Sequence, residues 1–170
     1  MTLYPKIKAI ILARGGSKGI PNKNIVDFCG KPLLAHTISQ TLSSKYIDEV
    51  YVSSDSEAIL EIAKKNGAIP VKRPGSISGD EASSESALNH FLHVCSNFEI
   101  MLFLQPTSPL RHTNDIDCAI EKYIKNNYDT LFSANKIDIL SVWSVEKDRY
   151  KSITYDYKER KRRQDIDNLI

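Results

Sequence analysis

The segment IKAIILARGGSKGIPNKN, residues 7–24, decides the fold class of this chain. Its first six residues form an apolar run with the length of a buried β-strand. The twelve that follow hold three glycines, one proline and the cations Arg14, Lys18 and Lys23. Ligands in open α/β sheets bind beyond the carboxyl ends of the strands, so this loop is a favoured ligand site. Glycine N–H groups and basic side chains both bind anions, and the loop therefore suits a chain of phosphates.

Two common phosphate-binding motifs do not match this loop. In GxxxxGK[ST] the second glycine stands five residues after the first, but here Ile20 follows Gly15 at that distance. In GxGxxG the second glycine stands two residues after the first, where this chain has Ser17. The ATPase and dinucleotide-oxidoreductase classes both lose support, and a solvated basic turn remains the alternative to a phosphate site.

The rest of the chain alternates apolar runs with amphipathic helical patterns, which predicts an α/β fold. We expect three layers, with a mainly parallel sheet and helices on both of its faces. Pro32 suits the first position of the first helix, residues 54–57 resemble a capping box before the second, and Gly67 would end it. Thr113 or Asn114 would cap the fourth. The predicted strands are residues 7–12, 49–53, 68–72, 99–104 and 130–134.

Length and composition indicate one soluble domain over residues 1–170. Of these residues, 41% are hydrophobic and 26% are charged, which is typical of a globular protein. No apolar run approaches the roughly 20 residues that cross a bilayer, and no signal-peptide pattern precedes the first strand. Outside residues 158–170, basic and acidic side chains are equal in number, which argues against nucleic-acid binding. We therefore expect a cytoplasmic protein without membrane or nucleic-acid partners.

The cysteines and histidines give no sign of a metal or redox site. Cys29, Cys95 and Cys118 are odd in number and lack paired spacing. We expect free thiols, packed in or near the core, in a reducing compartment. The four histidines are expected to be ordinary helix or loop residues rather than metal ligands.

Several short motifs occur in an order and spacing that one enzyme family shares. The glycine-rich loop ARGGSKGIPNKNI is followed by GKPLLAHTI (30–38), VSSDSE (52–57), Arg73-Pro74, Gly79-Asp80, Ser83-Ser84, LQPTSPLR (104–111) and RRQD (162–165). Together these motifs span nearly the whole chain. The sequence therefore resembles the acylneuraminate cytidylyltransferases, the family of CMP-sialic acid and CMP-legionaminic acid synthetases.

The resemblance implies a reaction, a fold and an assembly. The family joins CTP to a nine-carbon 2-keto acid sugar, of the sialic or legionaminic acid type, and releases a CMP-sugar and pyrophosphate. It has a nucleotide-diphospho-sugar transferase-like fold, uses Mg²⁺, and tends to form homodimers through an arm that matches residues 136–160. The partners implied for this chain are CTP, an acidic nine-carbon sugar and a second copy of the chain.

The point at which the sequence ends, soon after RRQD, leaves two alternative functions open. Family members usually continue past RRQD to a carboxylate pair that binds the metal, but this chain ends at Ile170. We therefore expect a C-terminally incomplete nucleotidyltransferase domain with weak or no turnover, and its metal ligands stay unknown. One alternative is another sugar nucleotidyltransferase that acts on 3-deoxy-octulosonate or pseudaminate. The other is a catalytically incomplete nucleotide-binding protein.

The resemblance also assigns roles within the nucleotide site. The nucleotide-binding residues that it implies are Arg14, Gly15, Ser17, Lys18, Lys23, Asn24, Arg73 and Ser84. Arg14 and Lys18 are also the implied catalytic residues, together with Arg163 of RRQD as a source of charge stabilisation at the reacting phosphate. Asn24 could instead be a turn residue, Arg73 a surface residue, and Ser84 a helix N-cap.

The remaining candidates concern the sugar and the metal. By resemblance, Gln105 recognises the acid sugar, and Arg111 could pair with its carboxylate. Arg111 could equally hold its own loop in place. Asp55 stands at a predicted helix start, where a carboxylate is usually a cap rather than a metal ligand.

Overall fold

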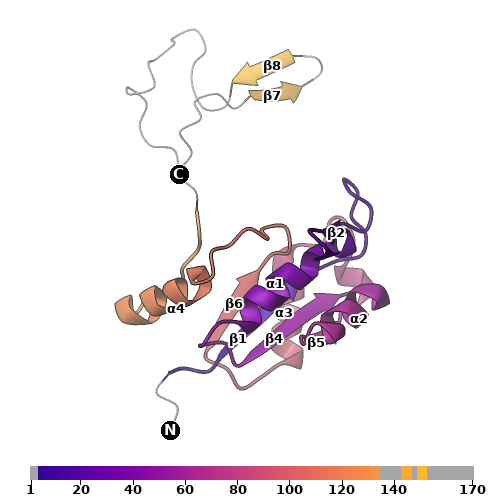
Figure 1. The fold of residues 1–170 in the computed structure, drawn as a ribbon. Coiled ribbons are helices and arrows are strands. Elements are labelled where there is room, and N and C mark those ends of the chain that lie inside the picture. The colour runs from indigo at the N-terminus through magenta and orange to yellow at the C-terminus, as the bar shows by residue number, and fades with distance from the viewer. Residues whose placement is uncertain (1–3, 135–142, 147–148, 153–170) are drawn as a thin grey trace. The chain divides into compact units, whose positions relative to one another are not determined.

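A computed structural model describes residues 4–134, 143–146 and 149–152. The chain divides into two compact units, residues 1–127 and residues 128–170. The first unit contains the sheet, its helices and the glycine-rich loop (Figure 1). Among the described residues, no helix is long and apolar enough to cross a membrane.

A four-stranded parallel sheet in the order β5-β4-β1-β6 forms the centre of the first unit. Its strands are β1 (Ile7–Leu12), β4 (Glu49–Ser54), β5 (Ile69–Lys72) and β6 (Ile100–Leu104). Each lies within one residue of a strand that the sequence predicted, so these four predictions are confirmed. The central strand β1 pairs with β4 on one side and with β6 on the other.

Helices cover both faces of the sheet, as the sequence predicted (Figure 1). They are α1 (Leu33–Leu42), α2 (Glu57–Lys65), α3 (Ser84–Val94) and α4 (Asp115–Asn126). Helices α1, α2 and α4 contribute to one apolar core, in which Leu34 and Ile38 of α1 pack with Ile11 of β1. Helix α3 covers the opposite face, where Phe91 packs with Ile10. Because both faces are covered, β1 is a continuous apolar run rather than an alternating one.

The smaller elements lie in loops and in the second unit. Strands β2 (Asp27–Phe28) and β3 (Lys31–Pro32) form an antiparallel pair, and η1 (Lys23–Ile25) and η2 (Gly75–Ile77) are single 3₁₀ turns. In the second unit, β7 (Trp143–Glu146) and β8 (Arg149–Ser152) pair antiparallel. Both strands fall within the predicted arm at residues 136–160, and the rest of that arm lies outside the described residues.

One predicted strand and one predicted helix cap were wrong. Residues 130–134 form no strand, because an apolar run needs a neighbouring backbone to become one and no described strand pairs with it. The capping box at residues 54–57 does not form, since Ser56 holds the N-cap position of α2 without a side-chain hydrogen bond. Asn114 does stand at the N-cap of α4, as one of the two predicted alternatives, although its side chain makes no cap hydrogen bond. Gly67 does end α2, with a positive φ of 88° that suits glycine.

The cysteines are free thiols, as predicted, but only one of them packs in the core. Cys95 is buried beside α3, whereas Cys29 and Cys118 are exposed. Cys29 lies in the turn between β2 and β3 with a φ of 52°, and Cys118 faces away from the core between Ile116 and Ile120 of α4. The prediction of near-core packing was wrong for these two residues.

Candidate active site

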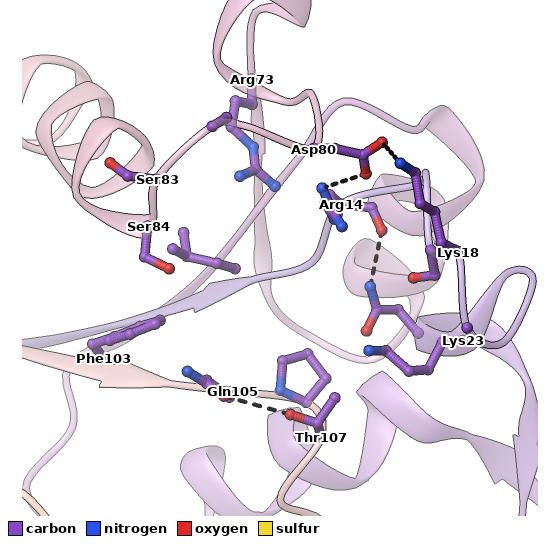
Figure 2. A pocket seen from close by; sticks show the side chains of 16 residues that line it. Arg14, Lys18, Lys23, Arg73, Asp80, Ser83, Ser84, Phe103, Gln105 and Thr107 are labelled. Carbon is purple, nitrogen blue, oxygen red and sulfur yellow. Dashed lines mark hydrogen bonds and ion pairs between the residues drawn. The ribbon is translucent and has the colours of Figure 1, made fainter. Parts of the chain in front are cut away.

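A cleft opens at the edge of the sheet where the strand order reverses. The chain runs from β1 outward to β4 and β5, and then returns through α3 to β6 on the other side of β1. The loops after β1 and β6 therefore diverge and leave a crevice, which is where ligands of doubly wound sheets bind. The cleft has a volume of about 440 Å³ and is lined from the loops after β1, β5 and β6 and from the start of α3 (Figure 2).

Most of the site residues predicted from sequence line this cleft. They are Arg14, Ser17, Lys18, Lys23, Asn24, Arg73, Ser84 and Gln105. Figure 2 shows Arg14 and Lys18 on one side of the cleft, facing Phe103 and Gln105 on the other. Gly15 and Arg111 do not line it. Arg163 lies outside the described residues.

Asp80 joins two of the predicted phosphate-binding cations. Its Oδ1 lies 3.1 Å from Nη1 of Arg14, and its Oδ2 lies 2.6 Å from Nζ of Lys18. Arg14 also donates a hydrogen bond of 3.0 Å to the carbonyl of Gly79. The Lys18 ammonium, and then Arg14, hold the pKa of the Asp80 carboxyl below its usual range. A carboxylate thus occupies the cationic side of the cleft.

Arg73 reaches the cleft from a buried position just after β5. Only 6% of the residue is exposed, so the alternative that it is a surface residue was wrong. Its Nη2 donates to the carbonyl of Ser53 at 3.2 Å, whereas its buried Nε has no partner among the described residues. Burial lowers the pKa of this guanidinium. A buried charge with an unused donor beside a cleft is costly unless a ligand pairs with it.

Two side chains fix the path of the glycine-rich loop. The buried Asn24 donates a hydrogen bond of 2.9 Å from its side-chain amide to the carbonyl of Arg14. Asp55 accepts a hydrogen bond of 2.9 Å from the N–H of Gly15. A Cβ at Gly15 would stand 3.0 Å from the Cβ of Ser56, so a larger residue would have to push Ser56 aside and glycine suits this close approach. Asp55 therefore holds the loop, and its prediction as a helix cap was wrong.

Helix α3 begins at the cleft with two serines. Ser83 is the N-cap, and its side chain accepts a hydrogen bond of 3.2 Å from the N–H of Ser86. Ser84 is the first helical residue, so the alternative that Ser84 is the N-cap was wrong by one position. Both serines line the cleft, where the positive end of the helix dipole favours an anionic or polar ligand.

The loop after β6 is tied to α1 by an arginine. Arg111 donates from Nη1 to Gln40 at 3.0 Å and to Thr37 at 3.3 Å, and from Nη2 to the carbonyl of Gln105 at 3.1 Å. Gln40 in turn donates to the carbonyl of Pro109 at 2.6 Å. Burial lowers the pKa of Arg111. These contacts favour the loop-holding alternative for Arg111 and leave Gln105 at the rim of the cleft.

Sequence reasoning assigned no role to several residues of the cleft. They include Asp80, Ser83, Phe103 and Thr107. Asp80 and Ser83 lie inside motifs that carried the resemblance, so their position was visible but their partners were not. Phe103 could not be told from a core residue, because β6 is one apolar run. Among the described residues, no group of three His, Cys, Asp or Glu side chains could hold a metal ion.

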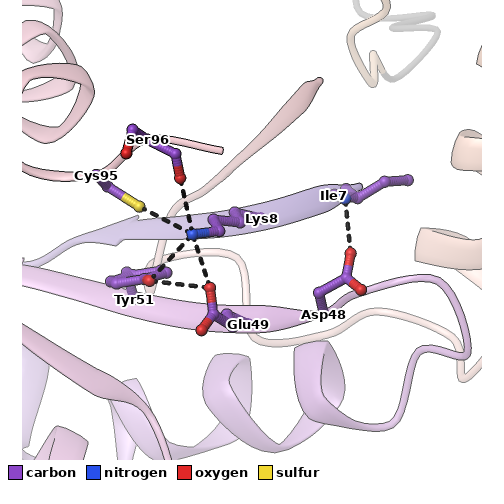
Figure 3. A network of polar contacts seen from close by, with 7 residues as sticks. All are labelled: Ile7, Lys8, Asp48, Glu49, Tyr51, Cys95 and Ser96. Atoms are coloured by element: carbon purple, nitrogen blue, oxygen red, sulfur yellow. Dashed lines mark hydrogen bonds and ion pairs between the residues drawn. The ribbon is translucent and has the colours of Figure 1, made fainter. Parts of the chain in front are cut away.

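A second polar network lies away from the cleft, on the α3 face of the sheet (Figure 3). The buried Lys8 forms an ion pair of 2.8 Å with Glu49 and donates hydrogen bonds to Ser96, Tyr51 and Cys95. The ion pair with Glu49 raises the pKa of Lys8, and burial raises the pKa of Tyr51 to about 12. These partners explain how an apolar strand accommodates a lysine, and the network has a structural role.

The fold and the cleft define a nucleotidyltransferase-like α/β protein with a cationic ligand site. The chain is similar in fold to CMP-2-keto-3-deoxy-manno-octonic acid synthetase complexed with CTP, with a TM-score of 0.63, 23% identity, and coverage of 72% of this chain and 48% of that one. It is also similar to a 4-diphosphocytidyl-2C-methyl-D-erythritol synthase, with a TM-score of 0.63, 12% identity, and coverage of 89% and 70%.

The chain belongs to the cytidylyltransferase family, whose family model matches residues 8–166. It is 42% identical over 134 residues to the pseudaminic acid cytidylyltransferase of Campylobacter jejuni subsp. jejuni serotype O:23/36 (strain 81-176). That match covers 76% of this chain and 58% of the relative. This chain is also 43% identical over 118 residues to the N-acylneuraminate cytidylyltransferase of Escherichia coli O18:K1:H7 (strain RS218 / NMEC). That match covers 69% of this chain and 28% of the relative. The chain thus spans about half, or less, of these relatives.

Proposed function

We propose that this protein transfers the cytidylyl group of CTP to a nine-carbon 2-keto acid sugar. The anomeric hydroxyl of the sugar forms a bond to the α-phosphorus, the bond to the pyrophosphate oxygen breaks, and the hydroxyl proton is released. The observation that carries the proposal is the cleft itself, where Arg14, Lys18, Lys23 and Arg73 converge at the switch point of the sheet. The names of the relatives support both sialic and pseudaminic acid as the class of sugar.

In this proposal, different residues bind the triphosphate, the nucleoside end of CTP and the sugar. Arg14, Lys18 and Lys23 bind the triphosphate and neutralise charge as pyrophosphate leaves. Arg73 offers its free Nε to the nucleoside end, where Ser84 presents a hydroxyl. Gln105, held by the loop after β6, faces the sugar. Such a displacement depends on positioning and charge rather than on a covalent intermediate.

Mg²⁺ enters this proposal as the ion that accompanies the triphosphate. The described residues do not offer it a ligand cluster, because Asp55 is engaged by Gly15 and Asp80 by Arg14 and Lys18. No step of the reaction is therefore assigned to a metal held by the described side chains.

Calorimetric titration with CTP, UTP, ATP and GTP, each with and without Mg²⁺, tests the nucleotide half of the proposal. We expect selective binding of CTP that Asn24→Ala or Arg73→Ala reduces at least tenfold. Lys64→Ala, which removes an exposed cation at the far end of α2, serves as the control and leaves binding unchanged. Equal affinity for all four nucleotides, or no binding of CTP, would contradict the proposal. Turnover is then assayed by pyrophosphate release with sialic, legionaminic and pseudaminic acids.

We also propose that the protein is a homodimer that uses the arm at residues 136–160. The resemblance supports this, and β7 and β8 supply two paired strands within that region. Sedimentation equilibrium at micromolar concentration should give twice the mass of one chain. A monomer mass across the whole concentration range would contradict the assembly without affecting the cleft.

A further inference from the structure

Asp80 is the one described carboxylate that lies among the cations of the cleft and pairs with two of them. Each of its two oxygens contacts a different cation, Oδ1 with Arg14 and Oδ2 with Lys18. These cations come from the glycine-rich loop after β1, whereas Asp80 follows β5. The contacts therefore join two segments that are far apart in the sequence, on the cationic side of the cleft (Figure 2).

This arrangement copies the way in which a phosphate group would bind. A phosphate, like a carboxylate, presents anionic oxygens on one centre and bridges neighbouring cations. Arg14 and Lys18 are two of the cations that the sequence assigns to the triphosphate. A ligand that uses them must displace Asp80 or share them with it.

Asp80 is placed where such a displacement is easy. Its side chain is 40% exposed, and it sits in a short turn closed by a hydrogen bond of 3.2 Å from the N–H of Ala82 to the carbonyl of Gly79. A Cβ at Gly79 would meet nothing within 4 Å, so there is open space beside the turn at this position. Exposed ion pairs of this kind contribute little free energy each. The two ion pairs thus let the Asp80 carboxylate compete with a ligand for Arg14 and Lys18, but they are too weak to exclude the ligand.

We propose that Asp80 is a specificity-determining residue of the cleft, whose carboxylate competes with phosphate groups for Arg14 and Lys18. Ligands that bring little negative charge to these cations do not displace it, whereas a polyphosphate does. Asp80 thereby sets the charge that a ligand must carry. This inference rests on the proposed function, since it assumes that Arg14 and Lys18 bind the triphosphate of CTP.

The test compares Asp80→Asn with the unaltered chain by calorimetric titration of inorganic tripolyphosphate, CTP and cytidine. Asp80→Asn should bind tripolyphosphate and CTP about three- to tenfold more tightly at low salt, as expected for the removal of two exposed ion pairs. The gain should shrink at high ionic strength, because salt screens exposed charges. Cytidine brings no phosphate, so its affinity should not change.

Two further variants separate this role from a general charge effect. Glu81→Gln removes the same charge from the next position, where the residue is exposed, and should leave all three affinities unchanged. Asp80→Glu keeps a carboxylate and should bind more like the unaltered chain than like Asp80→Asn.

The outcomes distinguish the inference from the proposed function. Equal or weaker binding of tripolyphosphate by Asp80→Asn, an equal gain in Glu81→Gln, or no binding of tripolyphosphate by either chain would overturn the role of Asp80. Binding of tripolyphosphate without selective binding of CTP would overturn the proposed function, while the comparison of Asp80→Asn with the unaltered chain would still decide the role of Asp80.

Discussion

Replacing Arg73 by methionine should separate the stability of the protein from its affinity for CTP. The buried guanidinium makes one hydrogen bond of 3.2 Å to the carbonyl of Ser53 and leaves Nε without a partner among the described residues. A buried donor without a partner costs about 1–3 kcal/mol, and one hydrogen bond from a charged group returns about 1.5–3 kcal/mol. Methionine keeps much of the apolar stem and removes both terms.

These opposing terms nearly cancel in the free protein. We therefore expect Arg73→Met to change the free energy of unfolding by no more than about 1 kcal/mol, in keeping with buried charges that apolar residues replace at little cost. Affinity for CTP should nevertheless fall at least tenfold, because the ligand loses a charged partner. The two quantities would then respond to one substitution in different ways.

Urea unfolding followed by circular dichroism measures the first quantity, and calorimetric titration with CTP measures the second. Lys64→Met, at the far end of α2, is the matched control and should change neither. A loss of more than about 2 kcal/mol in Arg73→Met would show that the guanidinium is a structural residue with satisfied contacts. Unchanged CTP affinity would refute its placement in the nucleotide site.

Three further predictions concern the network around Lys8 and the two loops of the cleft. Lys8 lowers the pKa of Glu49, so this carboxylate contributes stability above its ordinary pKa of 4.5 that is lost as pH falls through the lower folded value. The free energy of unfolding, measured with urea between about pH 3 and 7, should fall less steeply towards acid pH in Glu49→Gln than in the unaltered chain. Parallel curves for the two chains would count against the ion pair. Asp55→Ala frees the N–H of Gly15, so the glycine-rich loop must then be ordered on binding. CTP binding measured by calorimetry should therefore weaken about three- to tenfold. An unchanged affinity would show that other contacts hold the loop. Arg111→Met removes the contacts between the loop after β6 and α1, so hydrogen exchange measured by mass spectrometry should speed up across that loop, and unaltered protection would refute its anchoring role.

Much of the fold follows from patterns that are local in the sequence. The four strands of the sheet and their covering helices were predicted because a doubly covered strand is an apolar run and a covering helix has one apolar stripe. The failed strand at residues 130–134 shows the limit of this reasoning, since its apolar residues look the same whether or not a neighbouring backbone is present. The cap of α3 failed by one residue, because Ser83 and Ser84 are chemically equivalent in sequence and only the helix start distinguishes them.

In the cleft, too, the sequence indicates residues that stand close together in one loop but not their partners from distant segments. Arg14, Lys18 and Lys23 could be singled out from the sequence as candidates for an anion site, because they stand with several glycines directly after a buried strand. Asp80, which pairs with Arg14 and Lys18, is about sixty residues away from them, and no local pattern links it to them. Arg111 was left with two alternatives, since the sequence does not show that α1 lies within reach of its guanidinium.

By itself, the sequence determined the α/β class, the positions of the four strands that form the sheet, and the cationic loop at the carboxyl end of the first strand. It could do so because hydrophobic periodicity and glycine-rich turns act over a few residues. Only the tertiary structure decided that Asp55 holds the loop, that Arg73 is buried with a free donor, and that a carboxylate bridges the two cations. Those contacts join segments in or after β1, β4 and β5, which become neighbours only when these strands lie side by side in the sheet, and their energies depend on the burial that the whole fold creates.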